Sequence, residues 1–292
     1  MLFHFIQTTY IKTLLKIDNI GTNALHKTDS KTVNSHINLQ TKLHQAQLLE
    51  VAVAISINGI TQAVMMASPQ HLKDFALGFT LSEGFIHSIN EVLDIVVKSH
   101  DNGWQVDLHV LGKVQHRLKQ QRRTMAGPSG CGLCGVESIE AAMAVNLPVK
   151  ESSDKTPAQK KQIQLDLPSI EVIIRARDAL PSILSEAGGK RGNHCAAFFD
   201  LSGNVIAFRE DIGRHSALDK LLGCLSKDKL TTTEGFALIT SRCSHDLIIK
   251  AIRLSLTTLV TLAQPTDLAV SSARKMGLIL FCFQHGQLKR FA

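Results

Sequence analysis

Short β-rich runs and longer stretches with helical spacing alternate along this chain after residue 48. The first two runs, residues 48–57 and 60–67, flank Asn58-Gly59, which is a strong hairpin signal. Ser68-Pro69 then has the residue types of a helix N-cap and a first helical position. The helix that it predicts carries one apolar stripe and ends before Gly84. Two further strands are expected at Val92–Val97 and Trp104–Leu111.

The second half of the chain continues this alternation with more helix. A helix around Ile170–Glu186, interrupted at Pro181, precedes a second hairpin that turns at Ser202-Gly203-Asn204. The remaining expected elements are the strands Ala196–Asp200, Val205–Arg209, Phe236–Thr240, Leu256–Leu262 and Leu278–Phe283, and the helices Arg214–Leu225, Ser244–Leu254 and Asp267–Met276. Strands that alternate with helices at this spacing predict a sheet with parallel pairs and helices on its faces.

Two polar stretches without periodicity suggest how the chain is divided. Residues 1–40 are rich in Thr, Asn, Ser, Lys and His, which is typical of a poorly ordered extension. Residues 148–166 are polar and charged and predict a linker. We therefore expect a smaller α+β N-terminal domain at residues 41–147 and an α/β domain at residues 167–292.

Composition narrows the class of protein. The 292 residues are 44% hydrophobic and 20% charged, with a net charge of +7, which favours an anionic partner. One Trp, one Tyr and the lack of a basic run argue against nucleic-acid binding. No secretory signal and no membrane-length apolar run are expected from the sequence, so we predict a cytoplasmic protein whose six cysteines stay reduced.

A C-x-x-C pair, Cys131 and Cys134, lies in the glycine-rich stretch 127–135, just before a predicted helix. The positive potential at a helix start lowers a thiol pKa from about 8.5 towards roughly 3.5–7.5. Such a pair suits redox exchange, metal binding or the carriage of a sulfur atom. A structural zinc site needs four ligands, and the chain has no second C-x-x-C. The H-x-E motif of the zinc deaminases is also missing, so we predict neither that activity nor a resident metal.

Three polar stretches should meet beyond the carboxyl ends of the predicted parallel strands, where α/β sheets bind ligands. They are residues 209–215, 240–245 and 283–286, with Lys289 and Arg290 behind the last and Arg191 and His194 nearby. Cationic side chains and helix N-termini at such an edge bind phosphate groups. The alternative interpretation is that each stretch is an ordinary solvated loop, and that Asp219 with Lys220 forms a solvated helix face.

Five ordered motifs resemble the formate dehydrogenase accessory sulfurtransferases of the FdhD/NarQ family. They run from about Leu48 to the C-terminus. The motifs are A-V-M-M-A-S-P-Q-H-L-K-D-F-A-L-G-F-T-L-S-E-G, S-G-C-G-L-C-G-V-E-S-I-E, R-E-D-I-G-R-H-S-A-L-D-K-L-L-G, T-S-R-C-S-H-D-L-I-I-K-A and P-T-D-L-A-V. Their number and order make this resemblance far more specific than a lone C-x-x-C.

The resemblance implies a sulfurtransferase that accepts persulfide sulfur from a cysteine desulfurase. The sulfur would pass to the bis-guanine-dinucleotide form of the molybdenum cofactor, a bound substrate, for formate dehydrogenase. The family fold implies a cytidine-deaminase-like layered α-β-α C-terminal domain without zinc. By position, Cys131 would hold the persulfide and Cys134 would assist.

Candidate cofactor-binding residues come from the C-terminal stretch that, by the resemblance, matches the family's cofactor-binding segment, and from the cationic edge. They are Phe281, Cys282, Phe283, Gln284, His285, Gly286, His194, Arg214, His215 and Arg242. We expect cysteine desulfurase and formate dehydrogenase as partners, and a homodimer. Two alternatives remain: a non-catalytic chaperone that binds the molybdenum cofactor, and a redox or metal-binding module.

Overall fold

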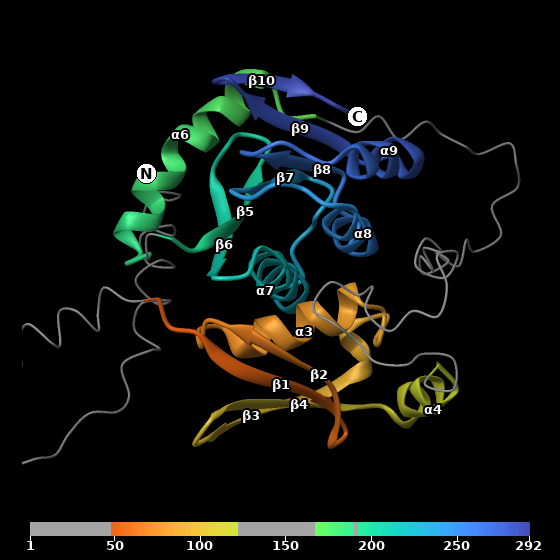
Figure 1. Cartoon of the computed structure of the whole chain (residues 1–292). Coiled ribbons are helices and arrows are strands. Elements are labelled where there is room, and N and C mark those ends of the chain that lie inside the picture. Colours follow the sequence, from red (N-terminus) through yellow and green to blue (C-terminus); the bar gives the residue numbers. More distant parts are fainter. Residues whose placement is uncertain (1–47, 122–166, 190–191) are drawn as a thin grey trace, which may run out of the picture. The chain divides into compact units, whose positions relative to one another are not determined.

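The computed structural model describes residues 48–121, 167–189 and 192–292 (Figure 1). Where they are described, residues 49–178 and 192–292 form one compact unit with two β-sheets and the helices that pack on them. The mixed α/β class is therefore confirmed. The predicted extension, the linker at 148–166 and both Cys131 and Cys134 lie outside the described residues, so the division into two domains stays a prediction.

The first sheet has four strands in the order β2-β1-β4-β3. Its strands are β1 (Val51–Ile57), β2 (Ile60–Ala67), β3 (Val92–His100) and β4 (Gly103–Val110). The predicted hairpin at Asn58-Gly59 is confirmed, and both turn residues have the positive φ that such a turn needs, 47° and 77°. Strands β1 and β4 are parallel, and the other neighbours are antiparallel.

Helix α3 (Leu72–Ser82) covers one face of this sheet (Figure 1). Its apolar stripe at Phe75, Ala76 and Phe79 packs against strand residues such as Val53 and Leu108, and all five are almost fully buried. The same core reaches the short helix η1 (Ile89–Glu91) through Ile89.

The predicted start of α3 at Ser68-Pro69 is wrong. The helix begins at Leu72, after His71, which has a left-handed backbone with φ 56°. Ser68 is instead buried, and both its main-chain N–H and its hydroxyl donate to the Asp211 carboxylate, at 3.0 and 2.9 Å. A tertiary partner has taken the hydroxyl that a local helix cap would use.

The chain after β4 forms a helix, α4 (Gly112–Gln121), that was not predicted. Val114 and Leu118 are one helical turn apart, and both are buried in the core of the first sheet. Two apolar positions among many charged ones were too weak a periodic signal to predict this helix from the sequence.

The second sheet has six strands in the order β10-β9-β8-β7-β5-β6. Its strands are β5 (His194–Asp200), β6 (Val205–Asp211), β7 (Gly235–Ile239), β8 (Thr258–Thr261), β9 (Ile279–Gln284) and β10 (Gln287–Arg290). The predicted parallel pairs are confirmed for β7 with β8 and for β8 with β9. Strand β10 was missed. The segment with Lys289 and Arg290 pairs with β9 across a turn at His285-Gly286 and forms a charged edge strand.

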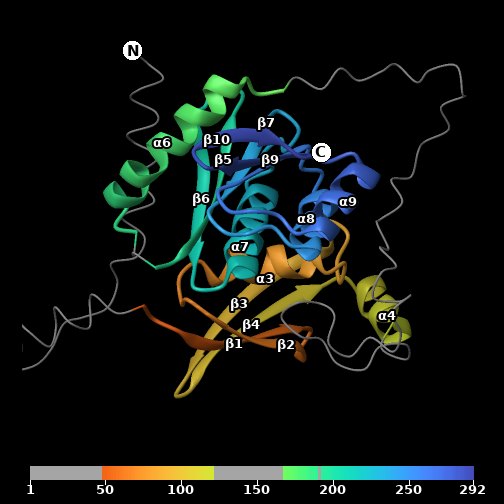
Figure 2. The same cartoon turned by 45° about the horizontal axis from the view of Figure 1, so that its top comes forward.

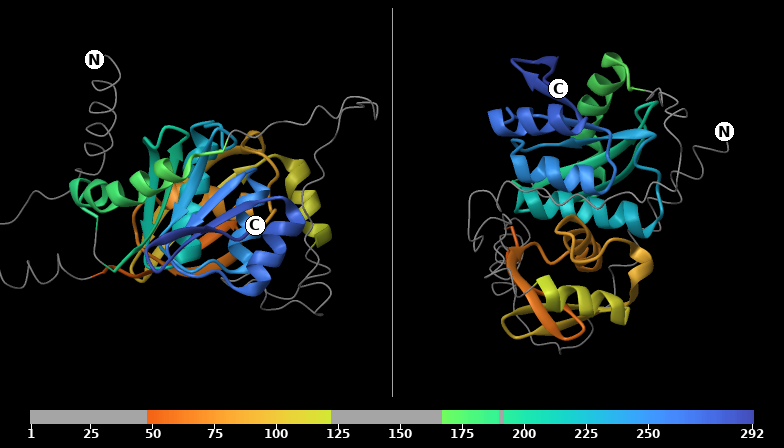
Figure 3. Two further views of the ribbon diagram at one scale, coloured as in Figure 1. Left: turned by 90° about the horizontal axis from the view of Figure 1, so that it is seen from above. Right: turned by 90° about the vertical axis from the view of Figure 1, so that its right-hand side faces the viewer.

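Helices cover both faces of the second sheet. On one face lie α7 (Arg214–Lys227), α8 (His245–Arg253) and α9 (Asp267–Met276), and their apolar residues share a core with the strands (Figure 3). The first turns of α6 (Ile170–Glu186) lie on the opposite face, where the Arg177 guanidinium is 4.4 Å from the Phe283 ring centre. The predicted interruption at Pro181 is wrong, because α6 continues through this residue. Proline removes only its own N–H donor, and the neighbouring turns keep theirs.

The two sheets are joined where α3 crosses α7, and the two helices touch through glycines (Figure 2). A Cβ atom on Gly78 would lie 1.8 Å from the main-chain oxygen of Asp219. A Cβ atom on Gly223 would lie 1.9 Å from the main-chain oxygen of Asp74. Both distances are far inside van der Waals contact, so only glycine permits this crossing.

We expect Gly78→Ala to destabilise the protein by about 3 kcal/mol or more, because the added methyl group must push two main chains apart. Urea unfolding followed by circular dichroism measures this change. Gly112→Ala is the matched control, since in the described part of the chain no atom beyond the neighbouring residues and the backbone of α4 itself lies within 4 Å of the added methyl group. Equal unfolding midpoints for the two variants would contradict the close crossing.

Candidate functional site

The strand register brings the predicted polar stretches to one edge of the second sheet. Strands β7, β8 and β9 are parallel, so their carboxyl ends share an edge. The start of antiparallel β5 and the end of β6 lie at the same edge, because His194 pairs with Asp211 and Ala196 pairs with Ile239. Residues 209–215, 240–245 and 283–286 therefore all emerge there. We call this the carboxyl edge.

The candidate cofactor-binding residues of the final strand divide into two groups. Phe281, Cys282 and Phe283 are buried inside β9, at most 8% exposed. Gln284 is half-buried, and His285 and Gly286 are exposed in the turn to β10. Strands β8 and β7 separate this turn from β5, which corresponds to roughly 14 Å at about 4.8 Å per strand. Of these six residues, only Gln284 and His285 present side chains at the carboxyl edge.

The other candidates gather around the start of α7. Arg214 and His215 open this helix, and His194 begins the adjacent strand β5. Burial, followed by the charges of Arg214 and Lys250, lowers the pKa of His215 to about 4. Burial and Arg214 also lower the pKa of His194. Both imidazoles are therefore neutral near pH 7, and the positive charge here comes from Arg214 and from the exposed Arg242.

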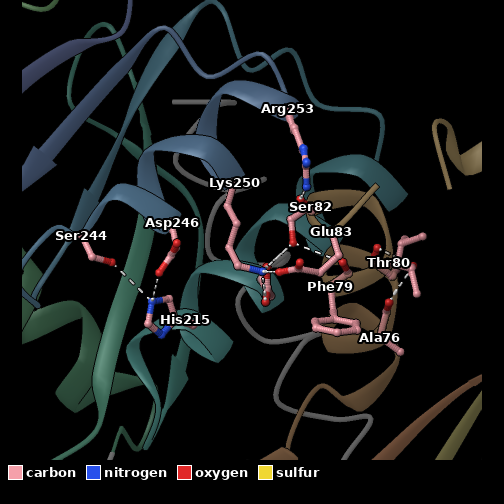
Figure 4. A network of polar contacts seen from close by, with 12 residues as sticks. Ala76, Phe79, Thr80, Ser82, Glu83, His215, Ser244, Asp246, Lys250 and Arg253 are labelled. Atoms are coloured by element: carbon pink, nitrogen blue, oxygen red, sulfur yellow. Dashed lines mark hydrogen bonds and ion pairs between the residues drawn. The ribbon is translucent and has the colours of Figure 1, made fainter. Parts of the chain in front are cut away.

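Sequence reasoning missed the group of charges beside His215, which comes from the end of α3 and from α8 (Figure 4). The Lys250 ammonium donates to Ser82 Oγ at 2.8 Å, to Glu83 at 2.7 Å and to Asp219 at 2.9 Å. The Arg253 guanidinium donates to the Ser82 carbonyl. Burial opposes ionisation of Glu83, but the Lys250 charge holds the pKa of that carboxyl below its usual range.

Two features of the sequence could have revealed this group. The motif that contains α3 ends in Ser82-Glu83-Gly84, polar residues directly after a buried helix. Asp246 and Lys250 are four residues apart on α8, so they lie on one face of that helix. Neither feature identifies its partner, because the contact with α3 joins residues about 170 positions apart.

The alternative that Asp219 and Lys220 form a solvated face is wrong. Both are buried, with side chains at most 2% exposed. Asp219 pairs with Lys250, whereas the Lys220 ammonium lies 2.6 Å from Asp211 and donates to Ser68 at 2.9 Å. Asp211 and Asp219 are thus each paired with a lysine.

A third ionic group closes the other end of the α3–α7 contact. The Asp74 carboxylate accepts from Arg209 and from Lys227, each at 2.6 Å. Burial opposes ionisation of Asp74, yet Arg209 and Lys227 hold the pKa of its carboxyl below the usual value. This group fixes the start of α3 against β6 and the end of α7.

The four cysteines in the described part of the chain are not suited to thiol chemistry. Cys195, Cys224, Cys243 and Cys282 are all buried. Burial raises the pKa of Cys224 and of Cys243 to about 12, and it raises the pKa of Cys195 further. Among all the residues that the structure describes, no cluster of His, Cys, Asp and Glu could hold a metal ion. No helix in the described ranges is long and apolar enough to cross a membrane.

Comparison with known proteins identifies the class to which this fold and site belong. Residues 48–291 match the model of the FdhD/NarQ family, so the chain belongs to that family. The chain is 39% identical over 234 residues to the sulfur carrier protein FdhD of Xanthomonas euvesicatoria pv. vesicatoria, covering 80% of this chain and 79% of the relative. It is 34% identical over 281 residues to the protein of the same name from Acinetobacter baylyi, covering 93% and 96%.

A solved structure shares the fold. The crystal structure of a protein described as a formate dehydrogenase accessory protein, from Desulfotalea psychrophila, has a TM-score of 0.57 with this chain. The likeness covers 83% of this chain and 86% of that protein, at 19% sequence identity. The mixed α/β arrangement is thus common to both.

We expect Lys250→Met to reduce the unfolding free energy by about 3–5 kcal/mol, because it leaves the buried Asp219 carboxylate without its cation. Urea unfolding at pH 7 measures the loss. Lys98→Met, at an exposed position of β3, controls for removal of a lysine charge. The assignment fails if both variants unfold at the same urea concentration.

The low pKa of His215 predicts a loss of stability on acidification between pH 6.5 and about 4. In this range the unfolded chain binds a proton that folded His215 does not, so stability rises with pH, by up to about 3 kcal/mol. His215→Gln should therefore show a smaller fall in unfolding free energy from pH 6.5 to 4 than the wild type. The exposed-residue control His109→Gln should keep the wild-type slope. A wild-type slope in His215→Gln would refute the buried neutral imidazole.

Proposed function

We propose that this chain is a sulfur carrier that serves formate dehydrogenase. The observation that carries the proposal is the family match over residues 48–291, which includes the C-x-x-C pair and the whole carboxyl edge. Relatives at 34–39% identity are named sulfur carrier proteins. The proposal assigns the same role to this chain, with formate dehydrogenase as the enzyme served.

Cys131 is the sulfur-carrying residue in this proposal. Its thiolate attacks the terminal sulfur of a desulfurase persulfide, forms a new S–S bond, and releases the desulfurase cysteine as a thiolate. No oxidant is consumed, because the sulfur arrives already in the sulfane state. The buried state of the four described cysteines supports this assignment, since none of them is an accessible thiolate. Cys134, three residues further on, assists release.

The molybdenum cofactor in its bis-guanine-dinucleotide form is the proposed acceptor, bound at the carboxyl edge. Arg214, Arg242 and the starts of α7 and α8 offer the cations and main-chain donors that diphosphate groups require. His194, His215 and the turn residues 284–286 extend the same edge. The proposal includes the cytidine-deaminase-like layering of the C-terminal part, a cysteine desulfurase as donor, a homodimer and a cytoplasmic location.

A second candidate function is a chaperone that binds the cofactor and delivers it without carrying sulfur. The carboxyl edge favours this alternative, because its cationic groups do not depend on the cysteine pair. The two functions differ in one cellular test. A chain with both Cys131 and Cys134 replaced by alanine would still activate formate dehydrogenase if it were only a chaperone.

We expect the purified chain to gain one sulfur atom after incubation with a cysteine desulfurase and cysteine, as seen by intact mass and reversed by reductant. Cys131→Ala should gain none, because the attacking thiolate is gone. Cys243→Ala removes a buried thiol instead and should load like the wild type. Loading of Cys131→Ala at the wild-type level would overturn the assignment of the carrier.

A further inference from the structure

His215 lies at the carboxyl edge with two oxygen-bearing side chains on one side of its ring (Figure 4). The Ser244 hydroxyl oxygen is 3.5 Å from Nε2, and the nearer Asp246 carboxylate oxygen is 4.0 Å from the same nitrogen. Both residues belong to the start of α8, whereas His215 belongs to the first turn of α7. Two helices thus place their polar residues around one ring nitrogen.

The chemistry of these partners selects one form of the imidazole. A carboxylate only accepts hydrogen bonds, and a neutral imidazole carries its proton on one nitrogen. A carboxylate 4.0 Å from Nε2 favours the proton on that nitrogen, with the Ser244 hydroxyl as its acceptor, and this form leaves Nδ1 with its lone pair. No residue in the described part of the chain forms a recorded hydrogen bond with Nδ1. The ring is thus a neutral hydrogen-bond acceptor within a group of cations.

An acceptor is scarce among the groups that surround it. Arg214, Lys250 and Arg253 can only donate hydrogen bonds. The carboxylates of Glu83 and Asp219 already receive the Lys250 ammonium, at 2.7 and 2.9 Å, and Asp246 lies on the Nε2 side of the ring. A ligand with phosphate groups and ring N–H donors would place its phosphates near the cations and one of its ring N–H groups at Nδ1.

Within residues 48–121, 167–189 and 192–292, no side chain forms a hydrogen bond with the Asp246 carboxylate that would explain its position. Its side chain is 20% exposed, and its nearest recorded polar contact is His215. Burial raises the pKa of Asp246, so the ionised carboxylate is less favourable at this position than in water. A carboxylate in the first turn also complements the α8 dipole, and the experiment must separate that effect from an effect on His215.

We propose that Asp246 is a positioning residue: with Ser244 it holds His215 in the Nε2–H form, so that Nδ1 accepts a hydrogen bond from a ring N–H of the bound ligand. Guanine and pterin rings both present such N–H groups. The identity of this ligand rests on the proposed function, whereas the state of the imidazole does not.

The first measurement is the tautomer of His215 in the full chain labelled with 15N-histidine, read from long-range proton–nitrogen correlations at pH 7. His215→Gln identifies the signal by its loss. We expect the wild type to be almost entirely Nε2–H, and Asp246→Ala to contain both tautomers in comparable amounts. Asp267→Ala, which removes an exposed first-turn carboxylate from α9, should leave the His215 signal unchanged. An unchanged tautomer in Asp246→Ala would overturn the proposal.

The second measurement compares guanosine diphosphate with inorganic pyrophosphate by calorimetry. Asp246→Ala should bind guanosine diphosphate about threefold to tenfold more weakly, the range for one lost hydrogen bond. Pyrophosphate has no N–H donor, and removal of a negative charge should leave its affinity equal or higher. Equal changes for both ligands, or no preference of the wild type for guanosine diphosphate over pyrophosphate, would overturn the acceptor role. Neither measurement depends on sulfur loading, so failure of Cys131 to load would refute the proposed function alone.

Discussion

The crossing of α3 and α7 determines how the rest of the molecule fits together. At Gly78 and Gly223 two helical main chains approach until a single methyl group would overlap a carbonyl oxygen of the other helix. The overlapping atoms are main-chain atoms, so a change of a neighbouring side chain could not relieve the clash. Close approach of the main chains also buries the polar residues on either side of the glycines. Those residues then need hydrogen-bond or ion-pair partners from across the crossing.

Charged side chains provide these hydrogen-bond and ion-pair partners. Asp74 is neutralised by Arg209 and Lys227 at one end of α3, and Ser82 and Glu83 contact Lys250 at the other. Buried ion pairs of this kind contribute little net stability compared with apolar packing, but loss of one partner is costly. Their geometry aligns α3 along α7 in one register. As a result, the end of the helix that covers the first sheet is placed beside His215, at the carboxyl edge of the second sheet.

Local signals in the sequence predicted most of the fold, and non-local contacts explain where those predictions failed. The Asn58-Gly59 hairpin, helix Asp267–Met276 and the parallel strands follow from turn chemistry and periodicity, and the structure confirms them. Ser68 has the residue type of a helix cap, but it bonds to a residue 143 positions away. The meeting of the polar stretches at the carboxyl edge followed from the predicted topology of the parallel strands. Glu83, Asp246 and Lys250 were missed because their proximity depends on the glycine crossing, which leaves no periodic pattern.

The long sequence separation of these ion pairs has a consequence for synthesis on the ribosome. The first sheet and α3 are complete once residue 110 has been made, but the lysine that donates to Ser82 and Glu83 is residue 250. At about 5–20 residues per second, these polar groups await their partner for on the order of ten to thirty seconds. Water can hydrate the charged face of α3 throughout that interval. A nascent chain with an apolar face in its place would expose a surface prone to aggregation.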